Sequence, residues 1–135
     1  MLGVKTYEPS YITSCRTRLD AQLKAYDIVA TTAAPAALAQ FASCLFANLV
    51  IVLDASFVHR VRAIEGKDGN PLNEVRMLAD SILHNEGVLM ANTTIKYKAD
   101  DSVLGHAIGD TIAIDRDSIE RLADRYFAEL RNRFT

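Results

Sequence analysis

The sequence predicts a mostly α-helical domain of the α+β class, with a four-helix core and a small antiparallel β-hairpin or sheet between helices three and four. Apolar residues recur at steps of three and four over most of the chain, and Pro9, Pro35 and Pro71 each stand where a helix is expected to begin. After Gly87 the pattern changes to alternation, which indicates short strands. The 135 residues, 50% of them apolar, suit a single domain over residues 1–135 with one hydrophobic core.

The first helix is expected over Ser10–Ala30. Tyr11, Cys15 and Leu19 recur on one face of this segment, while charged residues occupy the other face. Thr31–Pro35 should separate this helix from the next, because a residue that precedes proline avoids the helical conformation.

The most unusual segment is Ile28–Leu53, which contains no charged residue and no histidine. A helix at a protein surface normally keeps one polar face, so this segment must be covered by protein, by a partner subunit or by lipid. Pro35 limits a continuous helix to Ala36–Leu53, the lower edge of the length that spans a membrane, and Gln40 and Asn48 interrupt its apolar character. These observations favour a soluble protein over a membrane protein.

We therefore expect a buried central helix over Pro35–Ile64. Three other helices cannot easily cover so apolar a helix in a small domain, so a homodimer is predicted to bury part of it around Ala36–Leu53. Beyond Asp54 this helix should become amphipathic, with Arg60 and Glu65 among the residues that face solvent.

The third and the last helix carry the strongest signals. Asn70 should cap the third helix, with Pro71 in its first turn, and Gly87 should end it. The last helix is expected to start at Asp115 or Asp117. Its apolar stripe consists of Ile119, Leu122, Ala123, Tyr126, Phe127, Leu130 and Phe134.

Between these helices the residues alternate in polarity and are of types that favour strands. Val88–Met90 and Thr93–Lys98 predict a hairpin around Ala91-Asn92, and Thr111–Ile114 predicts a further short strand. Residues 87–114 are thus predicted to form the small β region.

Composition and cysteine usage limit the class of protein. A net charge of −2 argues against a chain that binds nucleic acid through a strong positive field. Cys15 and Cys44 lie far apart and outside any metal-binding pattern, so both are expected to be buried, reduced thiols. The first residues lack the basic start and apolar run of a signal peptide, and the predicted location is cytoplasmic.

One cluster of polar residues could bind an anion. His59, Arg60 and Arg62 lie close in sequence to Lys67 and to the helix start at Asn70. Cations beside exposed backbone N–H groups are what a phosphate or carboxylate requires. The alternative is that these cations simply face solvent near a helix C-terminus, where positive charge is favourable, and this alternative is preferred.

Metal and nucleic-acid sites have weaker support. Asp80 and His84 are four residues apart on one helical face, a spacing that can supply two metal ligands, but no third ligand is identifiable, so no metal and no cofactor are predicted. Lys96 and Lys98 could touch a nucleic acid, but the aspartates that follow offset their charge. Nucleophile motifs and glycine-rich phosphate loops are absent from the sequence.

The C-terminal two thirds of the chain resembles a group of short bacterial helical proteins. The resemblance covers residues 45–134 and rests on residues 72–78, 95–97, 102–105, 109–110, 121–122 and 127–130. That group has no assigned activity, so the resemblance implies no catalytic residue.

These observations favour a homodimeric binding or interaction protein without catalytic activity. An anion-binding or phosphorylated-metabolite-binding protein, or an enzyme on such substrates, is the alternative, and it would use His59, Arg60 and Arg62. A nucleic-acid-associated regulator, built on the third helix with the hairpin as a wing, is less favoured because the chain is almost neutral.

Overall fold

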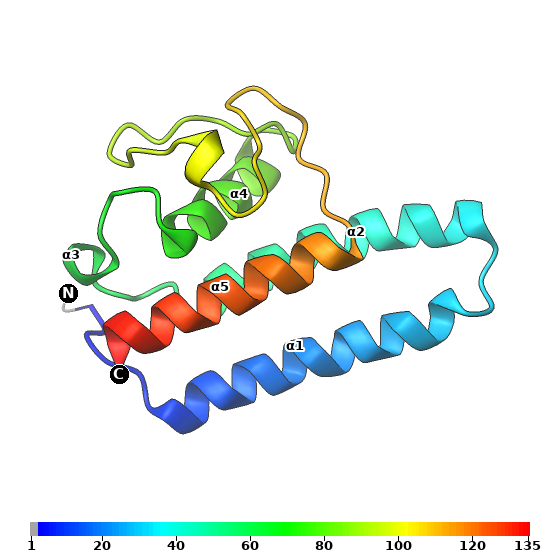
Figure 1. Cartoon of the computed structure of the whole chain (residues 1–135), viewed down its shortest axis with the longest axis horizontal. Helices are drawn as coiled ribbons and strands as arrows, with labels where there is room; N and C mark the ends of the chain where they lie inside the picture. Colours follow the sequence, from blue (N-terminus) through cyan, green and yellow to red (C-terminus); the bar gives the residue numbers. More distant parts are fainter. Residues whose placement is uncertain (1–2) are drawn as a thin grey trace.

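The fold is entirely helical in the computed structural model, which describes residues 3–135 (Figure 1). The elements in chain order are α1 (Pro9–Ala30), α2 (Pro35–Ser56), α3 (Arg62–Glu65), α4 (Pro71–His84), the 3-10 turn η1 (Ala99–Asp101) and α5 (Arg116–Phe134). Four of the five α-helices are long, and α3 is a single turn.

The predicted β-hairpin and sheet are not present, so the α+β class was wrong. Within residues 3–135 there is no strand, and the predicted β region contributes only one isolated bridge between Val88 and Thr111. Backbone groups of this region bond to different partners: Lys96 N–H donates to the carbonyl of Lys67 at 2.8 Å, whereas Leu89 N–H donates to that of Asp110 at 2.9 Å. Residues 87–89 thus bond to residues 109–112, and Lys96 bonds to Lys67, so the two predicted strands of the hairpin are not paired with each other.

Helices α1 and α2 form a hairpin, and other helices cover only part of its length. α1 and α2 run antiparallel and are joined by a short loop, while α4 and α5 pack against them (Figure 1). Ala34 is extended, with φ −62° and ψ 135°, as expected before Pro35, so the break between the two helices lies where it was predicted. The end of the hairpin that contains this break projects beyond the N-terminus of α5 (Figure 1).

The core forms around the two amphipathic helices that the sequence indicates most clearly. Every residue of the apolar stripe predicted for the last helix is buried in α5. On α4, Leu72, Val75 and Leu78 are buried as well. The side chain of Asn70 accepts hydrogen bonds from the N–H groups of Leu72 and Asn73, which confirms its role as N-cap.

α2 is shorter than predicted, ending at Ser56 rather than Ile64. Phe57 has φ −130° and ψ 29°, and its ring is buried against Tyr7 at 5.0 Å and Tyr126 at 6.1 Å. The helix therefore ends just before Phe57, whose aromatic ring packs in the core.

α2 is also far less buried than predicted. Its buried side chains all lie in its second half: Phe46, Leu49, Val50, Leu53 and Asp54. α2 is the only helix in the described part of the chain that is long and apolar enough to cross a membrane, and just 22% of its most apolar window is buried. Cys44 is exposed, contrary to prediction, because it lies on the face of α2 that the core does not cover, whereas Cys15 is buried as predicted.

Candidate functional site

Some of the residues predicted to bind an anion belong to a buried ion network at the end of α2. Arg60, in the loop after α2, is 2% exposed. Its Nη2 lies 3.1 Å from Oδ1 of Asp54, and its Nε lies 2.9 Å from Oε1 of Glu65. The same guanidinium also donates to the carbonyls of Phe57 and Leu72, at 3.0 and 3.2 Å. Arg60 therefore already binds two carboxylates of its own chain.

Glu65, at the end of α3, lies at the centre of the network and is fully buried. Arg76 of α4 donates to both of its carboxylate oxygens, at 2.6 and 3.1 Å, and Asn73 donates to Oε2 at 2.7 Å. Burial alone would raise the pKa of Glu65, but the hydrogen bond from Arg76 and the charges of Arg60 and Arg76 outweigh burial and lower it. Glu65 is thus held as an anion between two buried or half-buried cations.

Asn70 joins this network to the start of α4. Its Nδ2 donates to the carbonyl of Glu65 and to Oδ1 of Asp68, both at 2.8 Å, while its side-chain oxygen caps α4. From α5, Arg133 donates to the carbonyl of Glu65 at 3.2 Å. The network therefore connects α2, α3, α4 and α5.

The expectation that Arg60 and Glu65 face solvent was wrong. The structure brings Arg60, Arg62 and Asn70 together around Glu65, whereas the side chains of His59 and Lys67 are exposed. Arg62 is partly exposed, and its Nε lies 3.8 Å from Glu65 Oε1. Two of the cations that suggested an anion site, Arg60 and Arg62, therefore lie beside carboxylates of the chain itself. An external anion would have to displace Glu65 or Asp54 to reach Arg60.

Sequence reasoning missed the carboxylates of this network. One signal was available: an acid, a base and an acid (Asp54, Arg60 and Glu65) directly follow the apolar part of α2. Charges at the edge of a buried segment tend to pair with one another, because burial of an unpaired charge is costly.

A second buried carboxylate belongs to Glu74, in the first turn of α4. Glu74 is 2% exposed, and its two oxygens accept hydrogen bonds from the N–H groups of Val103 and Leu104 at 2.7 and 3.0 Å. Glu74 thereby fixes the loop after η1 to α4 and satisfies two backbone N–H groups of that loop.

The structure shows no metal centre at the weak candidates. Asp80 is half-buried and His84 is exposed on α4. Throughout residues 3–135 no group of three or more His, Cys, Asp or Glu side chains is arranged to hold a metal ion. The remaining histidine, His106, accepts a hydrogen bond at Nε2 from the N–H of Ala113.

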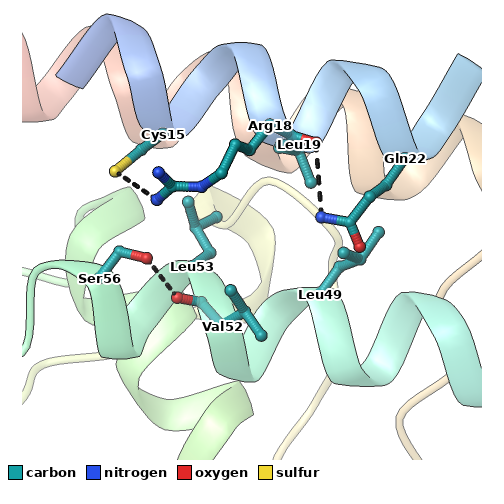
Figure 2. Close-up of a pocket in the computed structure, with 8 residues that line it drawn as sticks. All are labelled: Cys15, Arg18, Leu19, Gln22, Leu49, Val52, Leu53 and Ser56. Atoms are coloured by element: carbon teal, nitrogen blue, oxygen red, sulfur yellow. Dashed lines mark hydrogen bonds between the residues drawn. The ribbon is translucent and has the colours of Figure 1, made fainter. Parts of the chain in front are cut away.

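The narrow cleft between α1 and α2 is too small for a metabolite. Arg18 and Gln22 of α1 face Leu49, Val52 and other residues of α2 across it (Figure 2). Its volume is about 30 Å³, roughly the share of one water molecule in the liquid.

The hydroxyl of Tyr126 permits a stability prediction. It is buried and has no hydrogen-bond partner among residues 3–135, while the Tyr126 ring lies 5.9 Å from the guanidinium carbon of Arg60. Burial raises the pKa of Tyr126, so the hydroxyl stays protonated. Tyr126→Phe removes an unpartnered polar group and keeps the ring, and we expect it to raise the free energy of unfolding by about 1 kcal/mol.

Urea denaturation measures this change. Tyr97→Phe is the control, since the Tyr97 hydroxyl donates to the carbonyl of His106 and its removal should lower stability. A loss of stability in Tyr126→Phe as large as that in Tyr97→Phe would contradict the prediction.

The projecting end of the α1–α2 hairpin exposes an apolar surface. Ile28 and Val29 of α1 are 65% and 47% exposed, and Phe41 of α2 is 49% exposed. Phe41 stacks on Tyr26 with ring centroids 6.4 Å apart, beside an open, almost entirely apolar hollow of about 190 Å³. Large exposed apolar surfaces of this kind are typical of interaction sites.

No protein family, curated protein or solved structure that was compared with the chain matches it. The resemblance of residues 45–134 to short bacterial helical proteins therefore stays a prediction. Two features distinguish the molecule: a fully paired ion network at one end of α2 and an uncovered apolar face along the rest of that helix.

Proposed function

We propose that this protein is a non-catalytic interaction protein that forms a homodimer through α2. The observation that carries the proposal is the exposure of α2. Its segment 36–53 has no charge, yet only 22% of the most apolar window of this helix is buried in the monomer. Exposed apolar area of this extent is unfavourable in water by about 25 cal/mol per Å².

The exposed area of the whole chain agrees with a missing partner. The chain exposes 7583 Å², whereas a compact monomer of this size exposes roughly 7,000 Å². A stable interface removes about 800 Å² from each partner. A second copy that covers α2 would thus bring the exposed area per chain into the usual range.

A protein partner fits α2 better than lipid does. Phe46, Leu49, Val50 and Leu53 project from the second half of α2 into the core, and insertion of the whole helix into a bilayer would remove them from it. Asp54 at the end of α2 is paired with Arg60, which also ties the helix to the body of the protein.

Sedimentation velocity over a range of micromolar concentrations tests this proposal. The expected result is a dimer whose fraction increases with concentration. A monomer at all these concentrations would contradict it. Flotation with phosphatidylcholine vesicles is the companion measurement: if the protein floats with the vesicles and stays a monomer without them, lipid rather than a second copy covers α2.

A further inference from the structure

Six residues of α2 that the chain itself leaves exposed or half-buried follow one line along the helix. This stripe consists of Ala37, Phe41, Cys44, Asn48, Ile51 and Ala55, all exposed except Ile51, which is half-buried. The steps between them alternate between four and three residues. The residues on the contact line between two helices of a coiled coil are spaced in the same alternating way.

We propose that the two copies pair through this stripe with their α2 helices antiparallel, and that the twofold axis crosses α2 at the level of Phe46. This inference rests on the proposed function and specifies the contact. The ring of Phe46 points into the core of its own chain, so it leaves the stripe free for contact.

The stripe is complementary to itself when it is reversed. A twofold interface requires that whenever residue i contacts residue j of the partner, residue j also contacts residue i. Reversal about position 46 places Phe41 opposite Ile51 of the partner subunit and Ala37 opposite Ala55 of the partner subunit. Bulky residues then meet bulky residues, and small residues meet small residues.

The antiparallel arrangement also covers the part of α2 that its own chain leaves open. The first half of α2 has no buried residue, whereas the second half is packed into the body of the protein. In an antiparallel pair the open first half of each helix lies beside the second half of its partner. A parallel pair would instead leave the two projecting hairpin ends together, without a protein body beside either of them.

Two polar positions lie at the centre of the stripe, and they define the register. Reversal about position 46 places Cys44 opposite Asn48 of the partner subunit, once on each side of the axis. A single polar residue in an otherwise apolar contact line is known to select one register over others. α2 has no charge on the stripe or beside it as far as Leu53, so like charges do not oppose the pairing.

Disulfide formation in the Asn48→Cys variant tests the register. Mild oxidation should link Cys44 to position 48 of the partner and give a covalent dimer. The wild-type protein should stay unlinked, because its two Cys44 residues would be offset by four residues, about 6 Å along the helix axis, in addition to about 8–10 Å between axes. Disulfides require Cα atoms within roughly 7 Å.

A second pair of variants shows whether the disulfide depends on the proposed register or forms through nonspecific collisions between thiols. Cys44→Ser combined with Asn48→Cys should give no covalent dimer, since positions 48 are offset from each other in the same way. Cys44→Ser combined with Ala37→Cys and Ala55→Cys should again give a covalent dimer, because these two positions lie opposite each other in the proposed register. Circular dichroism checks that each variant keeps its helical content.

Each result either supports the inference or overturns it. A covalent dimer in Asn48→Cys but not in wild type supports the antiparallel register. Efficient linkage of wild type through Cys44 indicates parallel helices and overturns the register, while the homodimer itself stands. A dimer in sedimentation with no linkage in any variant places the interface elsewhere. A monomer in sedimentation overturns the proposed function together with this inference.

Discussion

Replacement of Glu65 by alanine should lower the free energy of unfolding by about 3–5 kcal/mol. Glu65 is fully buried, and its carboxylate lies 2.6 Å from Nη2 of Arg76 and 2.9 Å from Nε of Arg60. Removal of the carboxylate leaves a half-buried and a buried guanidinium without their shared partner, and such uncompensated charges are costly in a protein interior. Urea denaturation followed by circular dichroism measures the loss.

Asp20→Ala is the matched control, because Asp20 forms an ion pair with Arg16 at the surface. Surface pairs contribute at most about 1 kcal/mol, so this variant should be close to wild type. If the two substitutions have equal effects, the network does not stabilise the fold.

The pH dependence of the stability deficit in Glu65→Ala shows whether the lost ion pairs cause that deficit. The pKa of Glu65 lies below its ordinary value of 4.5 in the folded protein. The contribution of a group with a lowered pKa is fully present above its pKa in the unfolded chain and is lost as the pH falls through the lowered value. The deficit of Glu65→Ala should therefore be constant near neutral pH and shrink below about pH 4.

Phe41→Asp should abolish self-association and leave the monomer folded. Phe41 is 49% exposed on the projecting hairpin, so the monomer loses little core packing. In a twofold dimer the substitution introduces two carboxylates into an apolar contact, and burial of an unpaired charge is strongly unfavourable. We expect the dissociation constant to rise by at least about 100-fold, as a penalty near 3 kcal/mol implies.

Sedimentation velocity of Phe41→Asp against Ile108→Asp measures this effect. Ile108 is also 49% exposed but lies in the loop between η1 and α5, away from α2. Its replacement adds the same charge to the protein and should leave the dimer intact. Equal weakening by both variants would show that net charge, and not the stripe, controls association.

The sequence predicted the helices whose signals lie within their own residues. It did not predict the features that depend on contacts between distant parts of the chain. α5 and α4 carry apolar stripes of helical period, and Asn70-Pro71 marks a helix start by itself. These features need no knowledge of the rest of the chain, and the structure confirms them.

The end of α2 and the ion network could not be predicted in the same way. Arg60 has the local pattern of an exposed helical residue, and only the placement of Asp54 and Glu65 turns its side chain inward. The predicted hairpin failed for a related reason, because the backbone of Leu89 bonds to that of Asp110 and the backbone of Lys96 bonds to that of Lys67. Contacts over long sequence distances decided both cases.

The two ends of the described chain lie together, and this has a consequence for probes attached to the protein. The N–H of Tyr7 donates to the carbonyl of Phe134 at 2.7 Å, and both ends lie at the opposite side of the molecule from the projecting hairpin (Figure 1). Fluorophores attached at either end would therefore not obstruct α2. In an antiparallel pair the labels of the two copies would stand at opposite ends of the assembly, so energy transfer between them would be weaker than in a parallel pair, where they would stand together.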